Sequence, residues 1–181
     1  MEYSPSHQEL VDRSVQWLKT NPKYKCRIVL SEVYTNIKET PDVIGFSKTG
    51  RSVLIECKAS RSDFLSDKKK PFRKKASTGI GSERFYACPR GLIHESEVPS
   101  DWGLIWIYEN QIRIKVRPKS QKFSKDNERK FLISVLAKLD FLKPLDDSLA
   151  EYTQGFKTAA GKKQAKRSAK RKRRRRRVKK S

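Results

Sequence analysis

The sequence is poor in the residues that many classes of active site require. It contains two histidines, His7 and His94. Its three cysteines, Cys26, Cys57 and Cys88, form no C-x-x-C pair. These residues argue against a zinc ribbon, a disulfide framework and chemistry that needs several histidines. No apolar run approaches the ~18 residues of a membrane-spanning helix, and the polar N-terminus is unlike a signal peptide. We therefore expect a cytoplasmic protein with no membrane partner.

Acidic residues are missing from one part of the chain. From Phe156 to Ser181 there are 15 lysines and arginines and no acidic residue, whereas the first 155 residues carry 28 basic and 20 acidic ones. Most of the formal net charge of +23 over 181 residues therefore lies in the tail. Such a field attracts polyanions, with DNA and RNA as the leading candidates. Like charges repel and no apolar pattern follows Gln154, so we predict a domain over residues 1–153 and a disordered polybasic tail over 154–181.

Hydrophobic periodicity in the body predicts an α/β or α+β domain around a mixed β-sheet. In the helix expected at residues 60–70, Phe64 and Leu65 should face inward. The glycine-containing segment 76–82 should form a mobile loop. Helices are expected at residues 8–18, 60–70 and 126–142, and strands at 24–34, 42–46, 51–59, 83–88, 104–108 and 111–116.

The stretch from Thr40 to Ser60 carries the most informative pattern. Its second half is short, apolar and β-branched after a glycine-containing turn, which is typical of a buried strand. Because side chains alternate between the faces of a strand, Glu56 and Lys58 should share one face and Cys57 should lie on the other. A strand beginning at Asp42 would pair with it as a hairpin and bring a second carboxylate beside Glu56. Buried charges are normally paired or bound to a metal, so this group suits a magnesium ion and a phosphate.

The order and spacing of these residues resemble a known family. Pro-Asp at 41–42, followed after fourteen positions by Glu-Cys-Lys at 56–58, resembles the signature of the PD-(D/E)xK nuclease superfamily. Within it, the run ECKASRSDFLSDKK at 56–69 is similar to the MmcB-type DNA-repair proteins, as are Arg-Phe-Tyr-Ala at 84–87 and the segment 99–105. The resemblance covers roughly residues 28–108.

The resemblance implies a restriction-endonuclease-like core, in which helices flank a mixed sheet. It implies Mg²⁺, replaceable by Mn²⁺, held by the carboxylates of Asp42 and Glu56 and by the main-chain carbonyl of Cys57. Lys58 would orient or help deprotonate the attacking water. Glu32, near the end of the first strand, would be a third acid, both catalytic and metal-binding. A solvent-facing Glu32 is the alternative, and both interpretations stay open.

Basic residues after this strand are the candidate DNA contacts, because they follow the expected catalytic residues directly. The usual meaning of such a cluster is a solvated helix end. The tail adds phosphate contacts without base specificity. A nuclear or nucleolar targeting signal, ribosomal RNA binding and binding to an anionic membrane surface are the alternatives for the tail. The candidates are Arg61, Lys68, Lys69, Lys70, Arg73, Lys74, Lys75, Arg173, Arg174, Arg175, Arg176 and Arg177.

The first functional hypothesis is a Mg²⁺-dependent deoxyribonuclease, an endonuclease rather than an exonuclease, active in DNA repair or in phage or bacterial DNA processing at the nucleoid. The second is a non-catalytic nucleic-acid-binding protein that retains the nuclease fold and uses its basic surface, since a Glu-x-Lys pattern on a strand also occurs in cross-strand ion pairs. The third is an RNA-associated protein recruited by its tail. A monomer and a homodimer both fit the sequence.

Overall fold

The computed structural model describes residues 3–35 and 37–138, without the side chains of Phe72 and Lys74. Everything up to Val135 belongs to one unit, and the second unit, Leu136–Ser181, contributes residues 136–138 to the described part. The predicted tail, 154–181, lies outside the described residues. Within the described ranges, no helix combines the length and apolar character that crossing a membrane requires.

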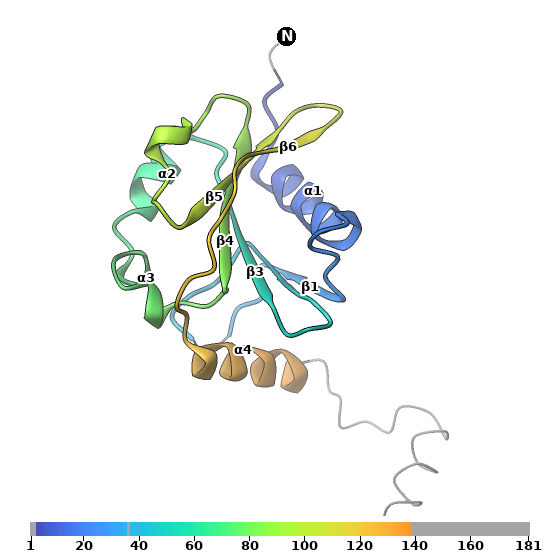
Figure 1. The fold of residues 1–181 in the computed structure, drawn as a ribbon, viewed down its shortest axis with the longest axis vertical. Helices are drawn as coiled ribbons and strands as arrows, with labels where there is room; N and C mark the ends of the chain where they lie inside the picture. Colours follow the sequence, from blue (N-terminus) through green and yellow to red (C-terminus); the bar gives the residue numbers. More distant parts are fainter. Residues whose placement is uncertain (1–2, 36, 139–181) are drawn as a thin grey trace, which may run out of the picture. The chain divides into compact units, whose positions relative to one another are not determined.

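One mixed six-stranded sheet organises the first unit, with its strands side by side in sequence order (Figure 1). The first three strands form an antiparallel meander, the third, fourth and fifth are parallel, and the last two form an antiparallel hairpin. This confirms the α+β class with a mixed sheet. The strands are β1 (Ile28–Ser31), β2 (Val43–Phe46), β3 (Ser52–Cys57), β4 (Glu83–Pro89), β5 (Trp102–Ile107) and β6 (Ile112–Val116).

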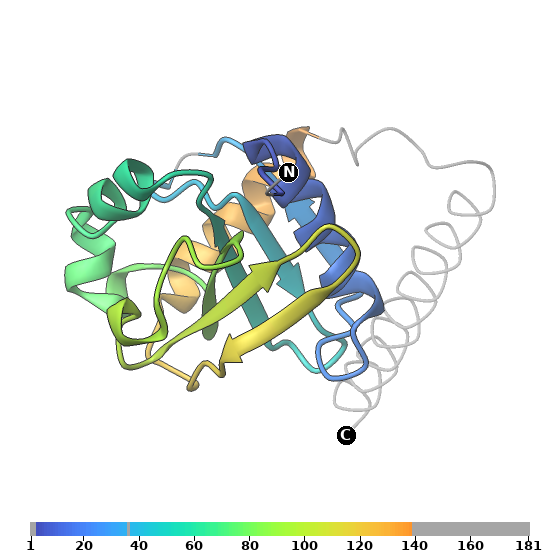
Figure 2. The same cartoon turned by 90° about the horizontal axis from the view of Figure 1, so that it is seen from above.

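Helices cover both faces of this sheet, as Figures 1 and 2 show. On one face, α1 (His7–Thr20) buries Leu10 and Leu18 against Val53 and Ile55 of β3. On the other face, a second core contains Phe64 of α2 (Arg61–Asp67), Phe131 of α4 (Lys125–Lys138) and Leu54 of β3. The short helix α3 is Pro71–Lys74, and two 3₁₀ turns are η1 (Ala76–Thr78) and η2 (Glu95–Glu97). The alternation of β3 therefore separates two cores, as the period-two pattern predicts.

Local sequence explains where the helices begin. Ser6 caps α1 by accepting from the N–H of Glu9 at 3.1 Å, and Ser60 caps α2 by accepting from the N–H of Asp63 at 3.2 Å. Pro71 begins α3, since a proline at the first helical position has no N–H that the helix would use.

One expectation for this region is wrong. Leu65 is exposed, because α2 is short and only the face that carries Phe64 meets the sheet. In segment 76–82, where the sequence predicts a mobile loop, η1 is followed by Ile80, which is fully buried and whose N–H donates to Glu39 at 2.7 Å.

Candidate active site

Asp42, Glu56 and Lys58 meet at one end of the sheet. β2 and β3 pair antiparallel with Val43 opposite Ile55, so one further step places Asp42 opposite Glu56. Asp42 directly precedes β2, and Lys58 directly follows β3. Chain reversal in the hairpin therefore brings together a carboxylate, a second carboxylate and an ammonium that are 14 and 16 positions apart in sequence.

The Asp42 carboxylate lies at the open end of this hairpin, directly before β2. Its Oδ2 accepts a hydrogen bond from the Cys57 N–H at 2.7 Å, and its side chain keeps 21% exposure. Burial, and then the negative charge of Glu56, raises the pKa of Asp42 from 3.8 to about 6. The Lys58 ammonium and the Cys57 N–H oppose this shift without cancelling it. Negative charge at Asp42 is therefore incompletely compensated by the surrounding protein.

Pro41 leaves a main-chain acceptor beside this carboxylate. Continuing the β2–β3 register places Pro41 opposite Cys57. The Cys57 N–H points toward β2, where Asp42 accepts it, and the Cys57 carbonyl points the same way because both groups of one strand residue face one neighbour. Proline has no N–H, so Pro41 cannot donate to that carbonyl. The Cys57 side chain is fully buried on the other face, as expected.

Glu56 and Lys58 lie on the second face of the sheet and are almost fully buried. Their side chains are 1% and 4% exposed, and Lys58 Nζ lies 3.4 Å from Glu56 Oε2. The same ammonium lies 3.6 Å from Asp63 and 3.6 Å from Asp67, both of α2. Burial alone would lower the pKa of Lys58, but Glu56 and then Asp67 outweigh it and raise that pKa, so Lys58 is a cation here.

Arg73 is the unexpected partner of these acids. Its guanidinium reaches Glu56 at 2.8 Å, Asp67 at 2.7 Å and Glu39 at 2.7 Å, and its side chain is 5% exposed. It was expected on the DNA-facing surface, and the structure instead turns it inward because three buried carboxylates need a counterion. We call Glu39, Glu56, Asp67 and Arg73 the buried ion network.

Asp67 and Glu39 are functional candidates that the sequence did not reveal. Asp67 is fully buried and accepts from the Tyr86 hydroxyl at 2.9 Å, and Lys70 Nζ lies 2.7 Å from it. Burial would raise the pKa of Asp67, but Arg73 and the two neighbouring lysines hold it well below its usual range. Burial raises the pKa of Glu39 despite Arg73. Arg73 lies 6 positions from Asp67 and 34 positions from Glu39, and neither separation is a helix or strand repeat that would indicate the network.

Glu32 lies near Asp42, but not on a strand face as the sequence predicts. β1 ends at Ser31, and Glu32 adopts a positive φ of 50° with its side chain 43% exposed. Its N–H donates to the Asp42 carbonyl at 3.0 Å. His7 Nε2, from the start of α1, lies 3.7 Å from Glu32 Oε1 and 3.9 Å from Asp42 Oδ1. Glu32 thus reaches the site from its solvent side, with His7 as an additional neighbour.

The other candidate DNA contacts differ in exposure. Arg61 is exposed, but it donates to both oxygens of Glu97 at 2.6 and 2.7 Å and to the Leu92 carbonyl at 3.0 Å. Lys70 pairs with Asp67, as described above. Three lysines, Lys68, Lys69 and Lys75, are exposed. The side chain of Lys74 and the arginines Arg173–Arg177 lie outside the described residues.

The donor set near Asp42 suits a hard divalent cation in part. Two carboxylates and a main-chain carbonyl are oxygen ligands of the kind Mg²⁺ prefers. In contrast, Glu56 already has a cationic partner. Within residues 3–35 and 37–138, no group of three or more His, Cys, Asp or Glu side chains is arranged to hold a metal.

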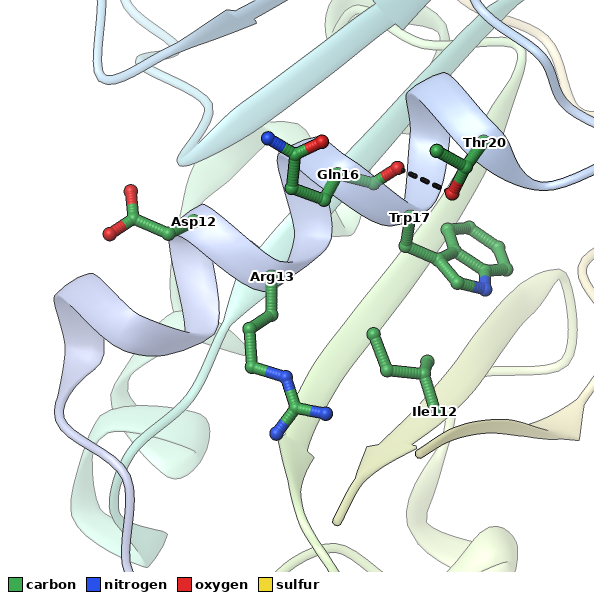
Figure 3. Close-up of a pocket in the computed structure, with 6 residues that line it drawn as sticks. All are labelled: Asp12, Arg13, Gln16, Trp17, Thr20 and Ile112. Carbon is green, nitrogen blue, oxygen red and sulfur yellow. Dashed lines mark hydrogen bonds between the residues drawn. The ribbon is translucent and has the colours of Figure 1, made fainter. Parts of the chain in front are cut away.

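A separate depression lies on the surface between α1 and β6, and Figure 3 shows the side chains that form it. Its volume is about 300 Å³, and none of the candidate catalytic residues contributes to its wall. It is lined by Asp12, Arg13, Gln16, Trp17, Thr20 and Ile112.

Comparison with known proteins adds information on the fold. No family model and no curated protein sequence matches this chain. A solved structure of a protein of unknown function from Silicibacter pomeroyi is similar, with a TM-score of 0.57 and 21% sequence identity. The match covers 77% of this chain and 92% of that chain. At this identity, the likeness shows a shared fold alone.

Proposed function

We propose that this protein is a metal-dependent DNA nuclease of the PD-(D/E)xK type. The observation that carries the proposal is the pairing of β2 with β3, which sets Asp42 beside Glu56 with Lys58 one residue past the strand. The element order α1-β1-β2-β3-α2-β4 agrees with the core that the sequence resemblance implies. DNA as the substrate fits the basic body and tail of the chain, and such a substrate fits action at the nucleoid.

The proposed roles follow from the contacts of each residue. Asp42, Glu56 and the Cys57 carbonyl would hold Mg²⁺, with Glu32 contributing from the solvent side. A bound Mg²⁺ would lower the pKa of a coordinated water and offset charge on the scissile phosphate. Lys58 is a cation held beside Glu56, and it would orient the attacking water and pair with a phosphate oxygen.

DNA cannot reach Lys58 or Glu56 in the described arrangement. Asp63 of α2 lies against Lys58, and Arg73 lies against Glu56. The segment 68–75, which carries Arg73, must therefore shift when substrate binds. Its exposed lysines, Lys68, Lys69 and Lys75, lie on the segment that would contact phosphate first.

A cleavage assay tests the proposal. Purified protein is incubated with linear, nicked, branched and single-stranded DNA in Mg²⁺, Mn²⁺ or EDTA. We expect cleavage with either metal and none with EDTA, and we expect Asp42→Asn, Glu56→Gln and Lys58→Gln each to abolish it. Arg27→Ala is a matched control, because this arginine is exposed and lies beside Phe46 at the opposite end of β2, where only its main-chain N–H donates to the Phe46 carbonyl. Folded protein that binds every DNA and cuts none in either metal would refute the proposal.

A second candidate is a nucleic-acid-binding protein that keeps the fold without cutting. The buried ion network favours this second candidate. Arg73 and Lys58 already neutralise Glu56, so these contacts are structural ion pairs. In that case Asp42→Asn and Lys58→Gln would leave DNA binding unchanged, and added Mn²⁺ would not raise the thermal stability of the protein.

A further inference from the structure

The candidate active site lies at the end of the sheet where the parallel strands finish, and residues that follow other strands lie at the same end. Because β3, β4 and β5 are parallel, their carboxyl ends meet at one edge. Lys58 follows β3, Arg90 follows β4 and Tyr108 follows β5. Neighbouring strands are about 4.8 Å apart, so Tyr108 lies roughly two strand spacings from Lys58. Arg90 and Tyr108 therefore lie at the same end of the sheet as Lys58.

A pocket of about 600 Å³ opens at this place. This volume is within the range of small-ligand sites, roughly 300–1,000 Å³. The Tyr108 ring is contacted by two guanidinium groups, Arg90 at 5.8 Å and Arg113 at 5.7 Å from its centre. The pocket is lined by Tyr3, Arg90, Gly91, Tyr108, Glu109, Asn110 and Gln111.

Arg13 of α1 fixes the wall of this pocket. It donates to the Tyr3 hydroxyl at 2.7 Å and to the main-chain carbonyls of Tyr108 and Gln111. Its guanidinium also lies 5.7 Å from the centre of the Tyr3 ring. The segment before α1 and the turn between β5 and β6 are thereby held together before any ligand arrives.

We propose that this pocket, which we call the Tyr108 pocket, binds a nucleotide of an unpaired nucleic-acid strand. A base would stack on Tyr108 in place of one guanidinium group, and Arg90 and Arg113 would then contact the phosphates beside it. Aromatic side chains flanked by arginines bind single strands in this way, because an unpaired base exposes the face that a duplex conceals. The lining holds one arginine and one acid, Arg90 and Glu109, and Arg113 beside the Tyr108 ring adds a second positive charge, which favours a polyanion. Strand binding stands by itself, whereas a role in placing the cut rests on the proposed nuclease function.

Binding by the full-length chain tests this proposal. The probes are end-labelled oligothymidine and a duplex of equal length, followed by fluorescence anisotropy in EDTA, which separates binding from cleavage. Salt of about 0.3 M weakens attraction between the basic tail and phosphate. The variants are Tyr108→Ala, the conservative Tyr108→Phe, Arg90→Ala and the control Arg27→Ala, each first checked for an unchanged thermal unfolding midpoint.

Stacking on one base predicts that Tyr108→Ala weakens oligothymidine binding by at least about fivefold. Tyr108→Phe should bind as the wild type does, Arg90→Ala should bind more weakly, and Arg27→Ala should be unchanged. Duplex affinity should change less than oligothymidine affinity in every pocket variant. Equal losses for both probes, or no loss in Tyr108→Ala, would overturn the proposal, whether or not the protein cuts DNA.

Discussion

Replacing Arg73 by methionine should lower the free energy of unfolding, because the buried acids that it neutralises lose their cation. The guanidinium contacts Glu56, Asp67 and Glu39 at 2.7–2.8 Å, and all three carboxylates are buried. Breaking a buried pair from one side costs about 3–5 kcal/mol, because the remaining charge stays unpaired. Lys58 and Lys70 still lie beside Glu56 and Asp67 in the variant. The loss of stability should therefore stay below three times the value for one broken pair. Against a typical stability of about 5–15 kcal/mol, such a loss is large.

The pH dependence of this loss identifies its cause. Burial already raises the pKa of Glu39, and removal of the guanidinium would raise it further. An acid with a raised pKa in the folded state contributes stability below its unfolded pKa and loses it as pH rises through the folded value. The deficit of Arg73→Met in urea unfolding should therefore shrink as the pH falls from about 8 toward about 5. Arg129→Met, which removes an exposed pair with Asp126, is the control and should unfold as the wild type does. An Arg73→Met variant within about 0.5 kcal/mol of wild type at every pH would refute the network.

Three further predictions concern the site, the core and the tail. Because the pKa of Asp42 is raised to about 6, its favourable contribution is present at low pH and is lost as pH rises through that value. Asp42→Asn should therefore gain stability relative to wild type as pH rises from about 4 to about 6 in urea unfolding, and parallel curves would contradict this. Gly103→Ala would place a Cβ 2.4 Å from the Phe85 ring, so the free energy of unfolding should fall by about 1–3 kcal/mol, and unchanged stability would show that the ring moves freely. Deleting residues 156–181 removes 15 positive charges, so DNA affinity and the slope of its logarithm against that of salt should both decrease, with the unfolding midpoint of the domain unchanged. An unchanged slope would show that the tail makes no phosphate contacts.

Local periodicity anticipated the part of the fold that positions the candidate site. The alternation in β3 places Glu56 and Lys58 on one face and Cys57 on the other, as a strand of period two requires. The helix before the meander and the one after β3 were likewise visible in their caps and apolar stripes, since both depend on neighbours within a few residues.

Contacts between distant parts of the chain were not visible in this way. The run of basic residues at 68–75 looks uniform in sequence, but Arg73 turns inward while Lys75 faces solvent, because buried acids from three segments surround only one of them. The sequence assigns Glu32 to a strand face, yet β1 ends at Ser31 and Glu32 adopts a positive φ. Both outcomes depend on tertiary partners rather than on local propensity.

A crystal soaked in manganese tests the central claim most directly, because anomalous scattering locates the ion without reference to activity. The account predicts one peak in contact with the carboxylates of Asp42 and Glu56 and with the Cys57 carbonyl, and a displacement of Arg73 from Glu56. A soaked crystal without a peak at these atoms, and with Arg73 still bound to Glu56, would contradict the metal site and the nuclease proposal with it.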